Sequence, residues 1–131
     1  RYEGPAPLPH GPGIDLLKQP ATYHPRIRPA RDGSVTCLHD LFAEAVRIPL
    51  ASTAGTDTAT VEIEVAIDVG AIGFYLVDDS GTAIPAADAI LPADPAPHRV
   101  TLRGRGARAL LVRNLYHRKR SRFRFVSLRQ R

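Results

Sequence analysis

The chain has 131 residues, of which 44% are hydrophobic and 24% charged, so it suits one globular domain with a single core and not a disordered polymer. Its lone cysteine, Cys37, excludes an internal disulfide framework and an all-cysteine zinc site. No apolar run approaches the roughly 20 residues that a membrane span needs, so we expect no such span and a cytoplasmic location. Because residue 1 is arginine and not methionine, we expect the chain to be a piece of a longer or processed protein.

The net charge of +5 hides an uneven distribution. Residues 1–98 have a net charge of −7, whereas residues 99–131 hold twelve basic side chains and no carboxylate. Nearly all of these basic residues are arginine, whose planar guanidinium binds carboxylates and phosphates with two hydrogen bonds. This segment either binds an anionic partner or lies beside acidic strands of the same sheet. We favour the second interpretation, because acidic residues recur at strand spacing earlier in the chain.

The first part of the chain is rich in proline, with seven of the twelve prolines in residues 1–29. Proline lacks an amide donor and has a fixed φ, so neither a regular helix nor a central strand is expected there. Residues 14–18 are long enough for about one helical turn. We predict that residues 1–34 form an extended proline-rich arm draped over the domain, or a linker, and contribute no core element. Residues 35–131 are predicted to form the domain.

The domain begins with an irregular entry or one helical turn at residues 41–45, followed by a strand at residues 46–50. Pro49 lies in that strand, which indicates an edge strand or a strand end. The turn-forming residues 51–60 separate it from the clearest strand of the chain, residues 61–69. Branched apolar residues occupy one face of that strand: Val61, Ile63, Val65, Ile67 and Val69. Glu62, Glu64, Ala66 and Asp68 occupy the other.

Apolar runs and turns continue to the end of the chain. Residues 72–77 predict a strand, and Asp78-Asp79-Ser80-Gly81 predicts a tight hairpin turn. A short strand at residues 82–85 and a loop at residues 86–97 are expected next. Further strands are predicted at residues 99–102, 107–115 and 122–128. In the last one the apolar phase changes after Phe125, which indicates a β-bulge at Phe125–Val126.

About seven short strands with no long amphipathic helix predict an all-β fold, an antiparallel β-sandwich of the jelly-roll type. Residues 62, 64 and 68 hold carboxylates, but on one strand face they are more typical of a salt-bridged surface than of an acid–base pair. Neither a nucleophile elbow nor a phosphate-binding glycine loop is present, so we expect no enzyme activity, no catalytic residues and no cofactor.

The only tight group of ligand-type residues is Cys37-Leu38-His39-Asp40. A closed zinc site needs about four ligands, and no second pair has suitable spacing, so we expect no metal site. A Cys–His nucleophilic pair is disfavoured, because residues so close in one segment seldom reach the required geometry. We interpret Cys37 as a buried structural thiol.

The basic segment from Arg113 to Arg122 is the most unusual local feature and is expected to be an exposed loop. Arginines there can bind an anion, and flat rings can contact a sugar. The candidate ligand contacts are Arg113, Asn114, Tyr116, His117 and Arg120, with Tyr75 as a further candidate. A solubilising turn without a ligand is the simpler alternative. The chain has no tryptophan, which disfavours a flat aromatic strip for a polysaccharide surface.

Residues 46–128 resemble a small β-sandwich accessory domain of the carbohydrate-binding type, as attached to bacterial FkbM-type methyltransferases and glycosyltransferases. The resemblance lies in Val46-Arg47-Ile48-Pro49-Leu50, in Gly70-Ala71-Ile72-Gly73-Phe74-Tyr75-Leu76, and in Leu111-Val112-Arg113-Asn114 followed by Ser121-Arg122-Phe123. It implies a non-catalytic module of a larger polysaccharide-related enzyme, whose catalytic domain lies outside this chain.

The leading functional prediction is therefore a non-catalytic carbohydrate-binding or accessory module, with a glycan or an anionic ligand as its partner. The main alternative is a docking module that packs on a neighbouring catalytic domain or subunit. Nucleic-acid binding by the basic C-terminal strands is the weaker alternative, because the chain has no recognisable nucleic-acid-binding motif.

Overall fold

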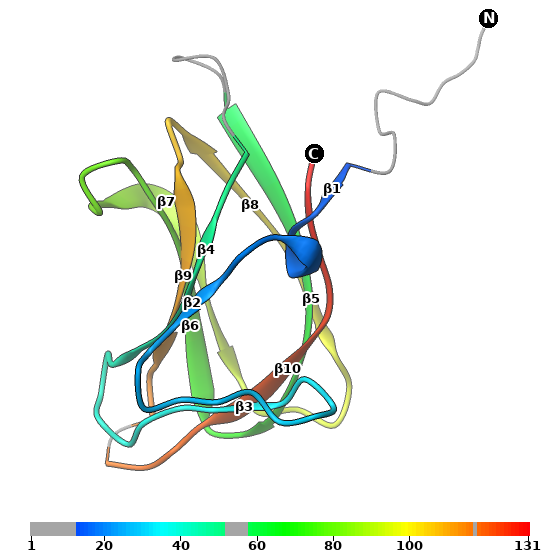
Figure 1. Cartoon of the computed structure of the whole chain (residues 1–131), viewed down its shortest axis with the longest axis vertical. Coiled ribbons are helices and arrows are strands. Elements are labelled where there is room, and N and C mark those ends of the chain that lie inside the picture. Colours follow the sequence, from blue (N-terminus) through cyan, green and yellow to red (C-terminus); the bar gives the residue numbers. More distant parts are fainter. Residues whose placement is uncertain (1–12, 52–57, 117) are drawn as a thin grey trace, which may run out of the picture.

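The computed structural model describes residues 13–51, 58–116 and 118–131, and its strands form two antiparallel sheets that face each other (Figure 1). Sheet A has the strand order β1-β10-β5-β8, with β3 also paired to β10. Its strands are β1 (Ile14–Asp15), β3 (Val35–Thr36), β5 (Thr58–Val69), β8 (His98–Arg105) and β10 (Arg122–Gln130). Sheet B has the order β2-β4-β9-β6-β7. Its strands are β2 (Thr22–Tyr23), β4 (Glu44–Pro49), β6 (Ala71–Val77), β7 (Ala83–Pro92) and β9 (Ala109–Asn114). The predicted all-β sandwich is confirmed.

The core lies between the two sheets because each long strand turns its apolar face inward. On β5 the buried residues are Val61, Ile63, Val65 and Ile67. Phe74 of sheet B meets Phe123 and Phe125 of sheet A edge to face, with ring centroids 6.3 Å and 6.0 Å away. Such aromatic contacts add to the free energy gained by burying the rings, so they help to hold the sheets together.

The predicted phase of β5 holds except at its last residue. Val69 was expected to point inward, but it is 41% exposed. The pairing with β10 shifts register between Arg122 and Phe123, so that Val69 stands opposite Arg122 and leaves the inward face. The bulge predicted at Phe125–Val126 is confirmed by a second register shift, between Phe125 and Ser127.

The prediction for residues 82–97 is wrong in one respect: β7 runs through Pro92, where a loop was expected. Its prolines misled the prediction, but β7 is the edge strand of sheet B, where a missing amide donor is tolerated. Ala86, with a positive φ of 61°, lies at the irregularity between the Tyr75–Asp88 and Val77–Ala83 pairs. The predicted hairpin turn before β7 is present, closed by a bond from the Gly81 amide to the Asp78 carbonyl.

Residues 13–34 lie along the sandwich, as expected of a draped arm (Figure 1). The one helical turn expected here is a 3-10 turn, η2 (Leu16–Lys18). Leu16 is only 1% exposed and Ile27 only 6%, so both belong to the core, which the prediction of an arm did not include. Residues 1–12 of the predicted arm lie outside the described residues.

Candidate functional site

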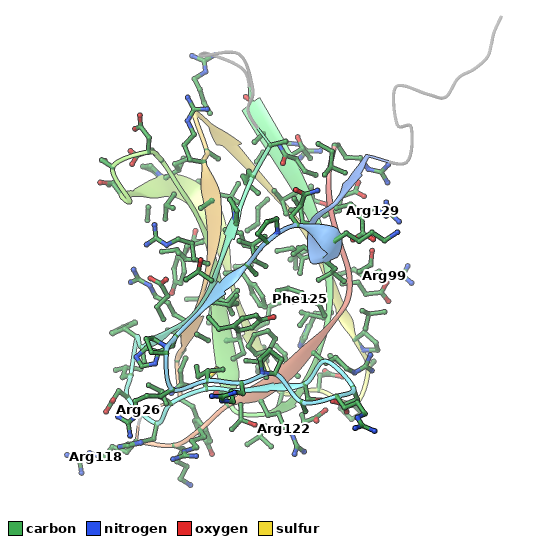
Figure 2. The ribbon with its side chains drawn as sticks, in the orientation of Figure 1. Arg26, Arg99, Arg118, Arg122, Phe125 and Arg129 are labelled. Atoms are coloured by element: carbon green, nitrogen blue, oxygen red, sulfur yellow. The ribbon has the colours of Figure 1, made fainter. Side chains whose placement is uncertain are left out.

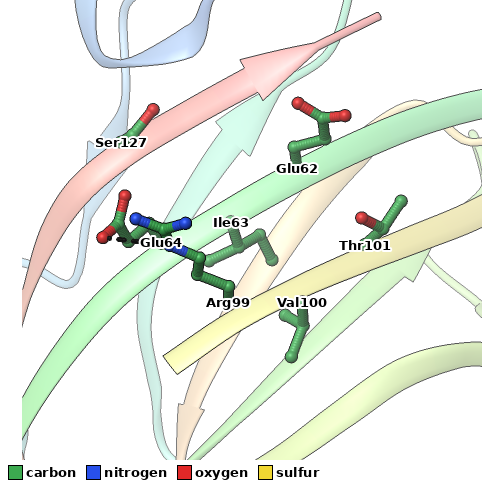
Figure 3. A pocket seen from close by; sticks show the side chains of 7 residues that line it. All are labelled: Glu62, Ile63, Glu64, Arg99, Val100, Thr101 and Ser127. Carbon is green, nitrogen blue, oxygen red and sulfur yellow. Dashed lines mark ion pairs between the residues drawn. The ribbon is translucent and has the colours of Figure 1, made fainter. Parts of the chain in front are cut away.

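A groove of about 400 Å³ crosses the outer face of sheet A (Figure 3). We call it the sheet A groove. Residues of three neighbouring strands line it: Glu62, Ile63 and Glu64 of β5, Arg99, Val100 and Thr101 of β8, and Ser127 of β10. It therefore joins positions that are up to 65 residues apart in the sequence, between residues 62 and 127.

The strand register explains why these side chains meet. On β5 the even-numbered residues point outward, since their odd-numbered neighbours fill the core. Antiparallel pairing sets Glu62 opposite Thr101 and Glu64 opposite Arg99 on one side. On the other side Glu64 stands opposite Ser127. The groove is thus a direct product of the two-residue period and of the order of the strands.

Ion pairs connect the acidic strand β5 to the arginines on both sides of it. Arg99 lies 3.4 Å from Glu64, Arg122 lies 3.1 Å from Asp68, and Arg131 lies 2.8 Å from Glu62. This confirms that basic C-terminal strands lie beside an acidic earlier strand. Glu62 and Glu64 act as charged partners of arginine, as expected of a salt-bridged surface and not of an acid–base pair.

The groove offers hydrogen-bond groups of both kinds. Carboxylates accept hydrogen bonds, the guanidinium donates them, and the hydroxyls of Thr101 and Ser127 do both. Ile63 and Val100 also border the groove, but their side chains pack toward the core between the sheets. The polar side chains suit a ligand with many hydroxyl groups, held from one side. A smaller hollow, lined by Ala66, Asp68, Ala93, Asp94 and Pro95, lies further along β5.

The predicted contacts Arg113 and Tyr75 come together on sheet B. The Arg113 guanidinium lies 5.5 Å from the centre of the Tyr75 ring. Gly73 makes this possible, because a Cβ at that position would lie within 3 Å of the outer end of the ring. Burial raises the pKa of the Tyr75 hydroxyl, Arg113 lowers it, and Asp88 raises it. The Nε of Arg113 is buried and has no hydrogen-bond partner among the described residues.

The other predicted contacts lie in or beside the loop between β9 and β10, which we call the β9–β10 loop. Tyr116 pairs with Lys119, whose Nζ lies 5.4 Å from the ring centre, and Arg120 is exposed. His117 lies outside the described residues. No contact described here connects Tyr116 or Arg120 to the Arg113–Tyr75 pair, so the structure divides the predicted contacts between two places.

Asn114 was predicted to contact a ligand, but it is fully buried. Its Oδ1 accepts hydrogen bonds from the Tyr116 amide and the Ser121 hydroxyl. Its Nδ2 faces the backbone oxygens of Leu38, Asp40, Tyr116 and Lys119. The side chain is thus committed to holding the β9–β10 loop and is closed to a ligand by burial.

The segment around Cys37 shows a structural thiol. Cys37 is 1% exposed, and burial raises the pKa of its thiol to about 12. The exposed His39 instead faces Asp40, with 3.7 Å between the two side chains.

Within the described ranges, no three His, Cys, Asp or Glu side chains are grouped as metal ligands. None of the described segments forms a helix with the length and apolarity needed to cross a membrane.

Sequence reasoning missed the sheet A groove. It placed Glu62 and Glu64 on an exposed face but did not connect them to Thr101 and Ser127. The alternation in each strand was visible, yet the groove depends on which strands are neighbours. That order was not deduced from the sequence.

No protein-family model matches the chain, and no curated protein matches its sequence. A solved structure described as "CBM4 structure and function" is similar, with 12% identity, a TM-score of 0.53, and coverage of 85% of this chain and 93% of that chain. Another, "EclA C-terminal domain; sugar-binding protein", has 21% identity and a TM-score of 0.48 over 84% of this chain and 89% of that chain. A third, "BiXyn10A CBM1 APO", has 9% identity and a TM-score of 0.45, and covers 88% of this chain and 94% of that chain. The latter two TM-scores are too low to support an argument, and the first likeness concerns the fold alone: the chain has a β-sandwich fold similar to that of a carbohydrate-binding module.

Proposed function

We propose that this chain is a non-catalytic carbohydrate-binding module that holds a glycan in the sheet A groove. The observation that carries the proposal is the groove itself, in which five polar side chains from three adjacent strands surround a hollow of about 400 Å³. The similar fold of the structure described as "CBM4 structure and function" supports it, because that structure is a carbohydrate-binding module.

The chemistry of the groove agrees with a glycan. Sugar hydroxyls donate hydrogen bonds to Glu62 and Glu64 and exchange them with Thr101 and Ser127. The ion pairs with Arg99 and Arg131 hold the two carboxylates in place before the ligand arrives, which lowers the entropy lost on binding. Such a site binds a sugar chain through many weak bonds and has no need of a cofactor.

The test is a glycan-array screen followed by affinity electrophoresis with the glycans that bind. The double variant Thr101→Val and Ser127→Ala removes two hydroxyls from the groove and little volume. We expect affinity to fall about thirtyfold, since each of the two lost hydrogen bonds costs on the order of 1 kcal/mol. Thr22→Val, at an exposed site on sheet B, is the matched control and is expected to bind as the parent does.

Two outcomes would contradict the proposal. If the folded parent chain binds no glycan, carbohydrate binding is wrong and docking to a neighbouring domain becomes the leading function. Ile90, 62% exposed on the edge strand β7, would then be the natural place to look for that interface. If the groove variant binds as well as the parent, the glycan lies elsewhere.

The Arg113–Tyr75 pair is the second candidate contact surface, because the buried Nε of Arg113 has no partner among the described residues. Arg113→Ala in the same assay separates the two places. With the glycan in the sheet A groove, this variant keeps the parent's affinity. A large loss with Arg113→Ala alone would move the site to the Arg113–Tyr75 pair on sheet B. The place of the module in a larger bacterial enzyme that handles polysaccharides, and its cytoplasmic location, stay predictions.

A further inference from the structure

The outer face of sheet A is rich in arginine beyond what its carboxylates neutralise. The central strand β5 presents Glu62, Glu64 and Asp68 on this face. Seven arginines lie on the flanking strands and at the end of the chain: Arg99, Arg103 and Arg105 on β8, Arg122, Arg124 and Arg129 on β10, and Arg131 after it. Ion pairs account for Arg99, Arg122 and Arg131, and Asp32 acts electrostatically with Arg124.

Arg103 and Arg105 differ from the others in what stands opposite them. Register places Arg103 across from Thr60 and Arg105 across from Thr58, so the neighbouring side chains on β5 are hydroxyls and not carboxylates. Both arginines are exposed, and neither takes part in an ion pair within the described part of the chain. Because β8 ends sheet A, its far side carries no further hydrogen-bonded strand among the described residues.

These arginines continue the line of the sheet A groove. Arg99 and Thr101 line the groove, and Arg103 and Arg105 follow at every second residue on the same face of β8. Residues two apart in a strand are roughly 6.6 Å apart, so the row from Arg99 to Arg105 extends over roughly 20 Å. That length accommodates several sugar units lying along the strand.

We propose that the glycan of this module is anionic, and that Arg103 and Arg105 bind its carboxylate or sulfate groups while the adjoining groove binds its hydroxyls. This inference rests on the proposed function and adds the class of ligand. Guanidinium groups bind both anions with two parallel hydrogen bonds, and Thr58 and Thr60 supply donors beside them. The charge order along the face, arginines at one end and paired carboxylates in the groove, matches a chain with an anionic group over the arginines and hydroxyls over the groove.

The same face disfavours nucleic acid. Duplex DNA carries one negative charge per roughly 1.7 Å of its axis, and Glu62, Glu64 and Asp68 would repel so dense a chain along β5. Single strands are bound by stacking on aromatic rings. The outward positions of the described strands of sheet A hold no aromatic side chain, since Phe123 and Phe125 point into the core. A sugar chain with dispersed anionic groups meets neither obstacle.

The experiment measures the affinity of the whole chain for four probes by affinity electrophoresis and calorimetry. Polygalacturonate carries carboxylates, a lightly sulfated dextran carries dispersed sulfates, and unmodified dextran is neutral. A random-sequence DNA duplex is the polyanion without sugar hydroxyls at its surface. The test variant is Arg103→Gln with Arg105→Gln. The charge-matched control is Arg26→Gln with Arg28→Gln, two exposed arginines outside sheet A, of which Arg26 lies at the far end of the molecule (Figure 2).

We expect the parent to bind at least one of the two anionic glycans about tenfold more tightly than dextran, and to lose that preference in the Arg103/Arg105 variant. The control variant keeps it. The binding weakens as NaCl is added, because the anionic contacts are exposed to solvent. Whichever anionic probe binds better identifies the acidic group.

Four results would overturn the inference while glycan binding itself persists. The first is that the parent binds neutral glycans as tightly as anionic ones, and the second is that the Arg103/Arg105 variant keeps the parent's preference. The third is that DNA binds more tightly than either anionic glycan, which would make the face a nucleic-acid surface. The fourth is that the variant associates with itself and keeps its affinity for anionic glycans, which would mean that the two arginines only protect the edge of sheet A. Failure of every glycan to bind would contradict the proposed function as well.

Discussion

The burial of Cys37 makes the stability of the fold depend on pH. Its side chain lies in the core, and its amide donates to the Ser121 carbonyl at 2.8 Å, so the segment before β4 is tied to the start of β10. The thiolate would lose its hydration there, and burial therefore raises the thiol pKa from 9.0 to about 12. The sequence predicted a buried structural thiol, and the structure confirms it.

This pKa shift predicts a loss of stability in alkali. The unfolded thiol releases its proton near pH 9 while the folded one keeps it, so unfolding is favoured as pH rises between the two pKa values. Below the unfolded pKa the contribution is constant. We expect the free energy of unfolding to fall by up to about 1.4 kcal/mol per pH unit in this window. Urea unfolding at a series of pH values measures the slope.

The slope should be smaller in Cys37→Ala than in the parent. Val35→Ala is the control, since it removes a buried side chain two residues away and leaves the thiol in place. It lowers stability at every pH and keeps the alkaline slope. An equal slope in Cys37→Ala and the parent would show that the thiol does not titrate differently in the two states.

At the scale of elements, the β9–β10 loop depends on Asn114 at the end of β9. One amide group faces backbone oxygens of two separate segments and accepts bonds from Tyr116 and Ser121. The partners also fix the orientation of the Asn114 amide. Its Nδ2 must face the backbone carbonyls, to which it donates, and its Oδ1 must face the two donors, from which it accepts. The loop that the sequence suggested as a binding site is therefore held from inside.

We predict that Asn114→Asp destabilises the protein at least as much as Asn114→Ala. Aspartate has the same shape as asparagine, but it replaces a donor with an acceptor that faces carbonyl oxygens. We expect each variant to cost about 3 kcal/mol or more in the free energy of unfolding, measured by urea denaturation. The control is Thr36→Ala, at an exposed site of β3, which is expected to change stability little. A mild effect of Asn114→Asp would mean that the loop has other anchors.

For the whole molecule, the main question is where the domain begins. The segment before residue 35 pairs with both sheets, Ile14 with Gln130 in sheet A and Thr22 with Arg47 in sheet B. Leu16 lies in the core between them. Folding of the sandwich and docking of this segment are therefore expected to be one cooperative event.

The adjacent leucines Leu16 and Leu17 provide a matched test. Leu16 is 1% exposed and Leu17 is 46% exposed. We expect Leu16→Ala to lower the free energy of unfolding by about 2–5 kcal/mol, and Leu17→Ala by less than about 1 kcal/mol. Thermal and urea unfolding measure both. Equal, small effects would support the prediction that residues 1–34 are an arm or linker outside the core.

The strand pattern could be predicted from the sequence because it is local. The alternation at residues 61–69, the turn at residues 78–81 and the bulge at Phe125–Val126 each depend on residues close in the chain. The edge strand β7 could not be predicted, because its prolines are tolerated at an edge and not in a central strand. Whether a strand is an edge depends on the order of the sheet.

The site shows the same division between local and distant causes. By itself, the sequence determined the sandwich, the acidic face of β5 and the surplus of arginine near the C-terminus. Only the tertiary structure decided that β5 lies between β8 and β10, which brings Thr101 and Ser127 into one groove with Glu62. It also decided that Arg103 and Arg105 face threonines and that Asn114 is buried. The physical reason is that the period of a strand sets which face a side chain occupies, whereas its neighbours on that face are set by register between segments far apart in the chain.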